Sequence, residues 1–453
     1  MSLEPPAGLL APLFAGETMR VVFADRSRLQ AMLDFEAALA VAEAAVGVIP
    51  RDAAAIVAKH CRAEAFDFAA LGVATALAGN PAIPLVKALT ARVASDDAAA
   101  ARYVHWGSTS QDVIDTGLML QLRSALTVIQ GDVDRLIATL AQQTALHRTT
   151  PLVGRTLLQH ALPITFGLKL AGWLDAMLRH RARLAALPER VLALQFGGAS
   201  GTLAALGDKG IAVGAALAVE LDLPQPNLPW HTHRDRLAEV ATTLGLLVGT
   251  LGKIGRDIVL SMQTEVAEIF EPAGVGKGGS SALPHKRNPV GSVVSQAAAI
   301  RVPGLVATML AAMMQEHERA AGGWHAEWEV LPEILILASG ALDHTLTMVD
   351  GMEVDAARMR RNLDATHGLI MAEAATAALG RHIGRSDAYA LVEAACKRAV
   401  KEDRTLGAVL AGEPVVTAHL LPTDLDKLLE PANYLGSAFA FVDRALAAVH
   451  DKR

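Results

Sequence analysis

The chain has 453 residues, of which 52% are hydrophobic and only 4% aromatic, so its apolar content is mostly Ala, Leu and Val, which favours helix. Its net charge of −6 argues against a non-specific nucleic-acid binder. Cys61 and Cys396 are its two cysteines and lie far apart, which excludes a disulfide framework and indicates a reducing, cytoplasmic compartment.

The first six residues lack the basic start and apolar run of a secretory signal. No stretch reaches the roughly 18 uninterrupted apolar residues of a membrane helix, so we expect no membrane partner. The positive mean hydropathy then indicates helices that are apolar on more than one face. Such helices are usually buried, here against other subunits.

Apolar residues recur at helical spacing along most of the chain, and prolines and glycines separate the segments. After an irregular start over residues 1–24, we expect helices at about 25–46, from Gly107 to 147, at 167–186, 233–270, 290–317 and 326–349. The spacing predicts an all-α fold with a central bundle of about five long helices and no strand-rich region. We expect three domains: residues 1–107, 108–350 and 351–453.

Polar residues cluster at the start of the helix that follows Gly107. His105, Ser108, Thr109 and Ser110 stand there, followed by Gln111 and Asp112. Hydroxyls and backbone amides at a helix start suit a carboxylate or a phosphate. The alternative is simple helix capping by Ser108, with Asp112 in the first turn.

A second cluster holds Arg155, Thr156, Gln159 and His160. If this segment is helical, the last two residues lie one turn after the first two. The alternative is a polar helix face without a ligand.

Two further clusters flank the longest predicted helices. His231 and His233 lack a third ligand nearby, so we expect no metal. Arg319 follows His317 and Glu318 and precedes a segment rich in Trp and Glu, residues 322–329. The alternative for this cluster is a helix junction with exposed charges.

A glycine-rich segment, residues 274–289, holds four glycines in six residues and ends in a group of polar and cationic side chains. These are Ser280, Ser281, His285, Lys286, Arg287 and Asn288. Glycines permit unusual backbone angles, so we expect a mobile loop that closes over an anionic substrate. Its Gly276-Lys277 pair does not meet the phosphate-loop pattern, which argues against nucleoside triphosphates.

Residues 279–289, Gly-Ser-Ser-Ala-Leu-Pro-His-Lys-Arg-Asn-Pro, closely resemble the signature of the fumarase/aspartase superfamily, with Leu283 in place of its usual Met. The Gly107–Asp112 and Gly154–Gln159 segments match its two other motif regions in the right order. The resemblance spans nearly the whole chain. It implies a three-domain helical subunit, no cofactor, and a homotetramer whose active sites combine the three regions from different subunits.

Within the superfamily, the chain is most similar to bacterial 3-carboxy-cis,cis-muconate cycloisomerases, which form 4-carboxymuconolactone during protocatechuate breakdown. Residues 197–207, 230–236 and 317–329 carry this likeness. The resemblance implies Ser280 as the proton-transfer residue, Lys286 and Asn288 as ligands of a substrate carboxylate and of the aci-carboxylate, and Thr109 and Ser110 as ligands of another carboxylate.

Superfamily lyases that expel an amine usually carry His after Gly-Arg-Thr, where this chain has Leu157. An amine leaving group needs a general acid, whereas a carboxylate leaves unprotonated. Leu157 therefore favours a cycloisomerase, although His160 lies close enough to substitute. The alternatives are an adenylosuccinate- or argininosuccinate-type lyase, a sulfomuconate cycloisomerase, and a non-catalytic structural protein with this fold.

Overall fold

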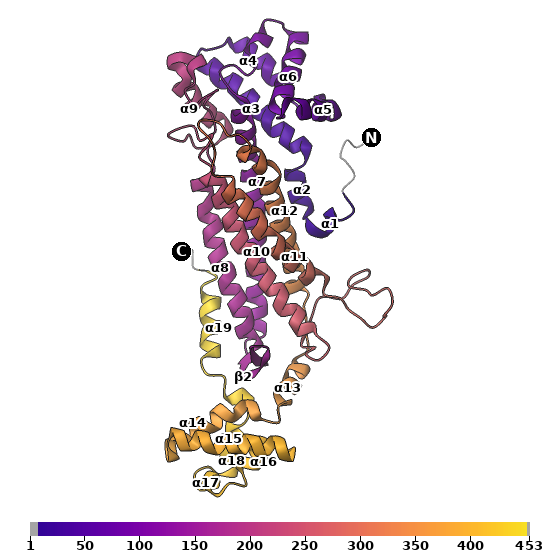
Figure 1. Cartoon of the computed structure of the whole chain (residues 1–453), viewed down its shortest axis with the longest axis vertical. Helices are drawn as coiled ribbons and strands as arrows, with labels where there is room; N and C mark the ends of the chain where they lie inside the picture. Colours follow the sequence, from indigo (N-terminus) through magenta and orange to yellow (C-terminus); the bar gives the residue numbers. More distant parts are fainter. Residues whose placement is uncertain (1–7, 451–453) are drawn as a thin grey trace. The chain divides into compact units, whose positions relative to one another are not determined.

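The computed structural model describes residues 8–450, which are mostly helical, as predicted (Figure 1). The expectation that the first six residues are not a secretory signal lies outside this range. The chain forms two compact units. The first comprises the residues up to Val133 together with Arg181–Gly252 and Val294–Asp343; the second comprises Asp134–His180, Lys253–Val293 and the residues from His344 onward.

Five long helices confirm the predicted central bundle, and each passes from one unit into the other. They are α7 (Ser110–Leu146), α8 (Phe166–Val191), α10 (Asp235–Met262), α11 (Val290–Ala311) and α12 (Gly323–Asp350). Helix α10 shows why they form: Leu237, Leu244 and Leu251 recur at helical spacing on one face, and all are fully buried. It ends at Met262 rather than near residue 270, because the chain turns and the Glu268 amide bonds to the Ser261 carbonyl.

The first unit adds shorter helices around the long ones: α1 (Ala11–Phe14), α2 (Glu17–Val22), α3 (Asp25–Ala45), α4 (Arg51–His60), α5 (Phe68–Ala78), α6 (Ala82–Asp96) and α9 (Gly210–Leu221). Helices α1 and α2 correct our expectation that the first 24 residues are irregular. The buried face of α3 packs on α4 and α9. Helices α10 and α11 approach closely at Gly252, because a Cβ atom there would lie 2.3 Å from the Cβ of Ala299.

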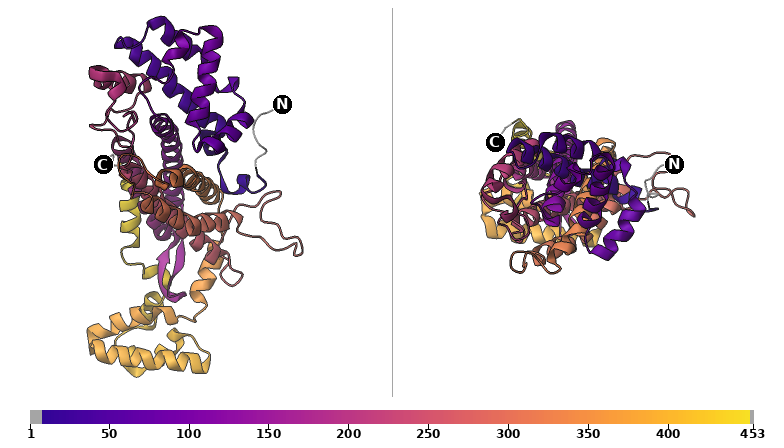
Figure 2. Two further views of the ribbon diagram at one scale, coloured as in Figure 1. Left: turned by 45° about the horizontal axis from the view of Figure 1, so that its top comes forward. Right: turned by 90° about the horizontal axis from the view of Figure 1, so that it is seen from above.

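A β-hairpin in the second unit corrects the prediction that the Arg155–His160 segment is helical. Strands β1 (Pro151–Thr156) and β2 (Gln159–Thr165) pair antiparallel, with Arg155 opposite His160 (Figure 2). Leu157 and Leu158 form the two-residue turn, and both have positive φ angles, as such hairpins require. Proline at positions 151 and 163 disfavours helix, and the β-branched residues of both strands favour pairing.

The second unit also holds a short ribbon of β3 (Ile269–Phe270) with β4 (Glu353–Val354) and the C-terminal helices. These helices are α13 (Ala356–Asp364), α14 (Ala372–Ile383), α15 (Arg385–Glu402), α16 (Leu406–Leu410), α17 (Pro414–Thr417), α18 (Pro422–Leu428) and α19 (Ala438–Ala447). Leu379, Val392 and Leu410 are among the buried residues of their core.

Five short 3-10 helices complete the described chain: η1 (Ala63–Ala65), η2 (Ala100–Tyr103), η3 (Ala204–Lys209), η4 (Leu369–Met371) and η5 (Pro431–Asn433). The three-domain division stays a prediction. Its boundaries fall just before α7 and at the end of α12.

Candidate active site

The first polar cluster lies at the start of α7. The Asp112 carboxylate accepts a hydrogen bond from the Thr109 amide at 3.1 Å, and the Ser108 hydroxyl lies 3.5 Å from it. This is the return half of a capping box, in which a third-position side chain satisfies the amide of the capping residue. Capping therefore occurs, but Asp112 provides it, and the hydroxyls of Thr109 and Ser110 remain available for other partners.

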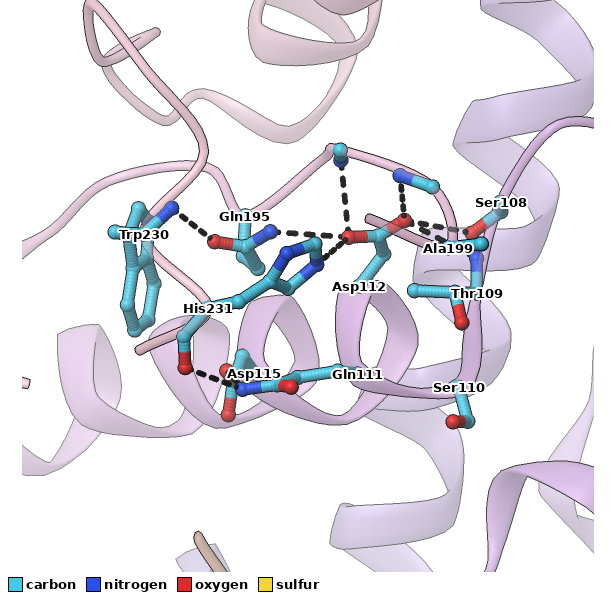
Figure 3. Close-up of polar contacts among 12 residues, drawn as sticks. Ser108, Thr109, Ser110, Gln111, Asp112, Asp115, Gln195, Ala199, Trp230 and His231 are labelled. Carbon is cyan, nitrogen blue, oxygen red and sulfur yellow. Dashed lines mark hydrogen bonds and ion pairs between the residues drawn. The ribbon is translucent and has the colours of Figure 1, made fainter. Parts of the chain in front are cut away.

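The buried Asp112 carboxylate also holds the glycine-rich segment that precedes α9. It accepts hydrogen bonds from the amides of Gly197 and Gly198 at 3.0 and 2.9 Å and from the Gln195 side chain at 3.0 Å (Figure 3). The His231 Nε2 atom lies 3.0 Å from the same carboxylate. Residues from three distant stretches thus meet at one carboxylate, and its multiple partners make the start of α7 rigid.

Arg319 reaches this helix start from the loop between α11 and α12. Its guanidinium donates to Thr109 Oγ1 at 3.0 Å, to Ser110 Oγ at 3.4 Å and to a backbone carbonyl at 3.5 Å. Among residues 8–450 it makes no ion pair. Burial lowers the pKa of the Arg319 guanidinium below its ordinary value, although the carboxylates of Asp112 and Asp115 act in the opposite direction.

The structure therefore brings Arg319 to Thr109 and Ser110, and we name these three residues the carboxylate cradle. A partly buried cation without a direct counter-ion gains from an anionic partner. The positive end of α7 adds to the attraction. A carboxylate is the simplest group that would satisfy two hydroxyls and one guanidinium.

His105 lies beside the cradle segment in sequence and has a positive φ of 61°. Its Nδ1 atom lies 2.6 Å from a carboxylate oxygen of the buried Glu36 in α3. Burial opposes the charged imidazolium, but the Glu36 carboxylate outweighs that effect and raises the pKa of His105. The sequence contains a signal for Glu36 as a polar partner. Glu36 and Glu43 are charged residues at helical spacing within the otherwise apolar face of α3.

The hairpin holds the second cluster. The Arg155 guanidinium forms a bidentate pair with the buried Glu268 carboxylate at 2.9 and 2.7 Å, and the Asn362 side chain donates to the same carboxylate. Arg155 thus anchors the hairpin to the segment that precedes β3. Thr156 and Gln159 close the hairpin as an exposed pair beside the turn.

His160 lies opposite Arg155 and is partly buried. Burial is the largest influence on its imidazole, and the Arg155 charge acts in the same direction, so the pKa of His160 is lowered despite Glu268. The neutral imidazole can accept a proton near pH 7. The Leu157 side chain at the turn is 94% exposed, so the position where amine lyases carry His presents an apolar group to the surroundings.

The loop between α10 and α11 contains no helix or strand over residues 274–289 and stands out in both views of Figure 2. The Ser280 Oγ atom accepts hydrogen bonds from the amides of Leu283 at 3.1 Å and Ala282 at 3.4 Å. Two backbone donors on one hydroxyl oxygen stabilise negative charge on that oxygen, as an oxyanion hole does. These two backbone amides would stabilise a Ser280 alkoxide, which the isolated side chain does not form readily.

Asn288 links the two ends of the loop by hydrogen bonds to Gly278 and Gly279. Its amide donates to the Gly278 carbonyl at 2.7 Å, and its side chain donates to the Gly279 carbonyl at 3.0 Å. Gly278 has a φ of 63°, and a Cβ atom there would lie 2.6 Å from the Asn288 carbonyl oxygen, so only glycine fits. The Arg287 guanidinium attaches this end of the loop to Glu353 through two hydrogen bonds of 2.9 Å.

The exposed Lys286 ammonium has no hydrogen bond or ion pair within residues 8–450 and is free to meet a substrate. A cavity of about 430 Å³ lies under the loop, lined by Lys277 and Lys286 among others. A larger cavity of about 730 Å³ lies along α14 and α15, but none of the predicted site residues line it. Of the predicted site residues, Lys286 and Asn288 line the cavity under the loop.

Comparison with known proteins identifies the family of the chain. A family model described as "Lyase" matches residues 15–304, and one described as "Adenylosuccinate lyase C-terminus" matches residues 368–445. The chain belongs to the fumarase/aspartase superfamily of lyases. This confirms the family that the three sequence motifs predict.

Members of the superfamily resemble this chain over nearly its whole length. The 3-carboxy-cis,cis-muconate cycloisomerase of Pseudomonas aeruginosa is 59% identical over 99% of this chain and 98% of that protein. The crystal structure of 3-carboxy-cis,cis-muconate lactonizing enzyme from Pseudomonas putida matches with a TM-score of 0.94 and 56% identity, over 97% of this chain and 98% of that one. A nitrosuccinate lyase of Streptomyces davaonensis is 44% identical over 97% of this chain and 94% of that protein.

Within its first unit, the structure joins Ser108, Thr109, Ser110 and Arg319 around one helix start, with His105 held by Glu36 nearby in the chain. Within the second unit, Arg155, Thr156, Gln159 and His160 lie together on the hairpin, and Ser280, Lys286 and Asn288 lie together on the loop. The sequence did not predict Asp112 as an organising carboxylate, nor the Glu268 partner of Arg155. Both have partners more than 80 residues away, so no local pattern marks them.

Proposed function

We propose that the protein is a cofactor-free cycloisomerase that converts 3-carboxy-cis,cis-muconate to 4-carboxymuconolactone. The observation that carries this proposal is the 59% identity, over almost the full length, to a protein with that activity. The carboxylate cradle supports it, because the substrate carries three carboxylates. On this proposal the protein acts in the cytoplasm, in the breakdown of protocatechuate through the β-ketoadipate pathway.

Lactonisation joins a carboxylate oxygen of the substrate to a carbon of the diene. As the C–O bond forms, the π electrons of that double bond move towards the neighbouring carboxylate and give an aci-carboxylate. The Ser280 hydroxyl then delivers its proton to the carbon next to the new bond. The serine alkoxide that remains is stabilised by the amides of Ala282 and Leu283 and takes up a proton before the next cycle.

The substrate carboxylates need separate partners. Thr109, Ser110 and Arg319 bind one of them through the cradle. Lys286 and Asn288 hold another and stabilise the developing aci-carboxylate. Within its own subunit, the Asn288 side chain donates a hydrogen bond to the Gly279 carbonyl. Its binding role requires that the substrate replace this carbonyl as acceptor when the loop closes.

The hairpin supports a cycloisomerase over an amine lyase. Leu157 cannot donate a proton, and the lowered pKa of His160 favours its neutral imidazole, which has no proton to give to a leaving amine. In the lactone-opening direction the leaving group is a carboxylate, which needs no acid. We place Arg155, Thr156, Gln159 and His160 beside the substrate as binding residues, with His160 as the alternative to Ser280 in proton transfer.

A second candidate is an elimination that releases an unsaturated dicarboxylate, as in adenylosuccinate- or argininosuccinate-type lyases. The 44% identity to a nitrosuccinate lyase and the match to the adenylosuccinate lyase C-terminal model favour it. A sulfomuconate cycloisomerase is a close variant. A purely structural protein is disfavoured, because Ser280, Lys286 and Asn288 are all present.

Incubation of the purified protein with 3-carboxy-cis,cis-muconate is expected to abolish the ultraviolet absorbance of the diene without added metal. Parallel reactions with adenylosuccinate and argininosuccinate should release no fumarate, and the sulfonated muconate tests the close variant. No loss of diene absorbance at neutral pH would contradict the proposed activity. Fumarate release from either control substrate would establish the lyase instead.

We further propose a homotetramer whose active sites combine residues of different subunits. Helices α10 and α11 are each long and apolar enough to cross a membrane by length and composition alone, which is weak evidence for a span. The apolar window of α10 is 61% buried, whereas that of α11 is only 28% buried. Val293, Ile300 and Met314 contribute exposed apolar surface on or just after α11, which suits burial against other copies of the chain.

Mixing two impaired variants tests the shared site. Ser280→Ala changes the third motif region, and Arg319→Leu removes the guanidinium that contacts the first, at the start of α7, so a mixed tetramer contains some sites with neither change. After co-refolding, we expect activity to return to a sizeable fraction of the wild-type value, and sedimentation should give four chains per particle. A monomer, or a mixture no more active than the separate variants, would contradict the shared site.

A further inference from the structure

Trp324 lies under the Arg319 guanidinium at the start of α12. The centre of the guanidinium is 5.7 Å from the indole ring, within the range of a cation–π contact. The indole is buried, and its Nε1 atom donates a hydrogen bond to the Asp115 carboxylate at 3.0 Å. The hydrogen bond to Asp115 therefore holds the indole ring in place under Arg319.

Asp115 is itself held by buried partners. The Arg234 guanidinium donates to it at 2.6 and 3.1 Å, and the Gln111 side chain donates at 3.0 Å. Arg234 also pairs with the buried Glu327 of α12. This buried ion triad of Asp115, Arg234 and Glu327 ties together the starts of α7, α10 and α12, and its low exposure leaves water little access.

Arg319 needs such support because it stands on a loop. Its direct polar partners are two hydroxyls and one carbonyl, none of which carries a charge. Recognition of a carboxylate by a guanidinium depends on the orientation of the planar group, and a free arginine side chain loses entropy when it is fixed. A rigid ring under the guanidinium removes part of that cost before the ligand arrives.

We propose that Trp324, held by Asp115, is a positioning residue that orients Arg319 for the substrate carboxylate. The proposal rests on the carboxylate cradle of the proposed function. Trp324 itself does not touch the substrate in this scheme; it acts through the plane and direction of the Arg319 guanidinium.

Trp324→Phe keeps an aromatic ring under Arg319 but removes the N–H that bonds to Asp115. We expect KM for 3-carboxy-cis,cis-muconate to rise about tenfold, the equivalent of one lost hydrogen bond, with kcat changed less than about threefold. The matched control is Trp328→Phe, one turn later on α12. Its Nε1 atom is buried but has no hydrogen-bond partner within the described chain, so KM should stay near the wild-type value.

A double-mutant cycle separates positioning from a general structural effect. In an Arg319→Leu background, Trp324→Phe should change KM less than about twofold, because the residue that it positions is gone. An equal rise in both backgrounds, or an equal rise in Trp328→Phe, would overturn the proposal. Thermal unfolding of each variant shows that the compared proteins are folded.

Calorimetric titration with tricarballylate, a saturated tricarboxylate, keeps this test distinct from the catalytic proposal. The Kd should rise about tenfold in Trp324→Phe and stay unchanged in Trp328→Phe. If the wild type binds tricarballylate but does not consume the muconate, the proposed reaction fails while the positioning role is still measured. If the wild type does not bind tricarballylate at all, both the carboxylate-binding role of the cradle and the positioning role of Trp324 are contradicted.

Discussion

Replacing Ser280 with alanine is expected to reduce kcat by at least a factor of about 100, the scale of losing a general acid or base. The variant keeps the loop backbone but has no hydroxyl to deliver a proton, and the amides of Ala282 and Leu283 lose their acceptor. KM should change little, because the carboxylate-binding residues remain. Steady-state kinetics on the diene absorbance measures both quantities.

Ser281→Ala is the matched control, since it removes a neighbouring hydroxyl from the same loop. The Ser281 hydroxyl makes no hydrogen bond to the described residues, and its side chain is exposed. Its turnover should stay near that of the wild type. A Ser280→Ala protein with near-normal turnover would remove Ser280 from the mechanism and direct attention to His160 as the proton carrier.

Replacing Arg234 with methionine is expected to lower the free energy of unfolding by about 3–5 kcal/mol, the cost of leaving buried charges unpaired. Asp115 and Glu327 both lose their cation, and each is about 1% exposed. Burial already raises the pKa of Glu327, and the Arg234 guanidinium is the largest influence that opposes that rise. Urea unfolding at one fixed protein concentration measures the loss.

Two comparisons identify the cause of this loss. Arg256→Met on the same helix removes an exposed guanidinium and should change the free energy by less than about 0.5 kcal/mol. Adding Asp115→Asn and Glu327→Gln to Arg234→Met removes the stranded charges and should recover a large part of the stability. No recovery would mean that packing, and not charge, dominates at this position.

The sequence predicts the long helices well because their apolar residues recur at helical spacing over many turns. Helices α7, α11 and α12 begin within about three residues of the predicted positions. The prediction of a helix at residues 155–160 was wrong, because the segment forms a hairpin. A strand of six or seven residues gains its hydrogen bonds from a partner strand. In a short segment with mixed polarity, local spacing alone does not distinguish that pairing from a helical turn.

The candidate site divides in a similar way. Motif order and residue type were enough to select Ser280, Lys286, Thr109, Ser110 and Arg319, because each stands in or beside a patterned segment. Local geometry was also predictable on the loop, where backbone amides a few residues away support the Ser280 hydroxyl.

Only the tertiary structure decided which side chains hold these residues in place. Asp112 is bonded to Gly197 and His231, Trp324 to Asp115, and Arg155 to Glu268, across separations of 85 to 209 residues. Buried polar groups must find partners wherever the fold brings them, so the pairing is set by helix packing and not by neighbours in the chain. The sequence by itself determined the long helices and the superfamily and supplied the candidate site residues; the fold decided which of those residues are held by buried partners.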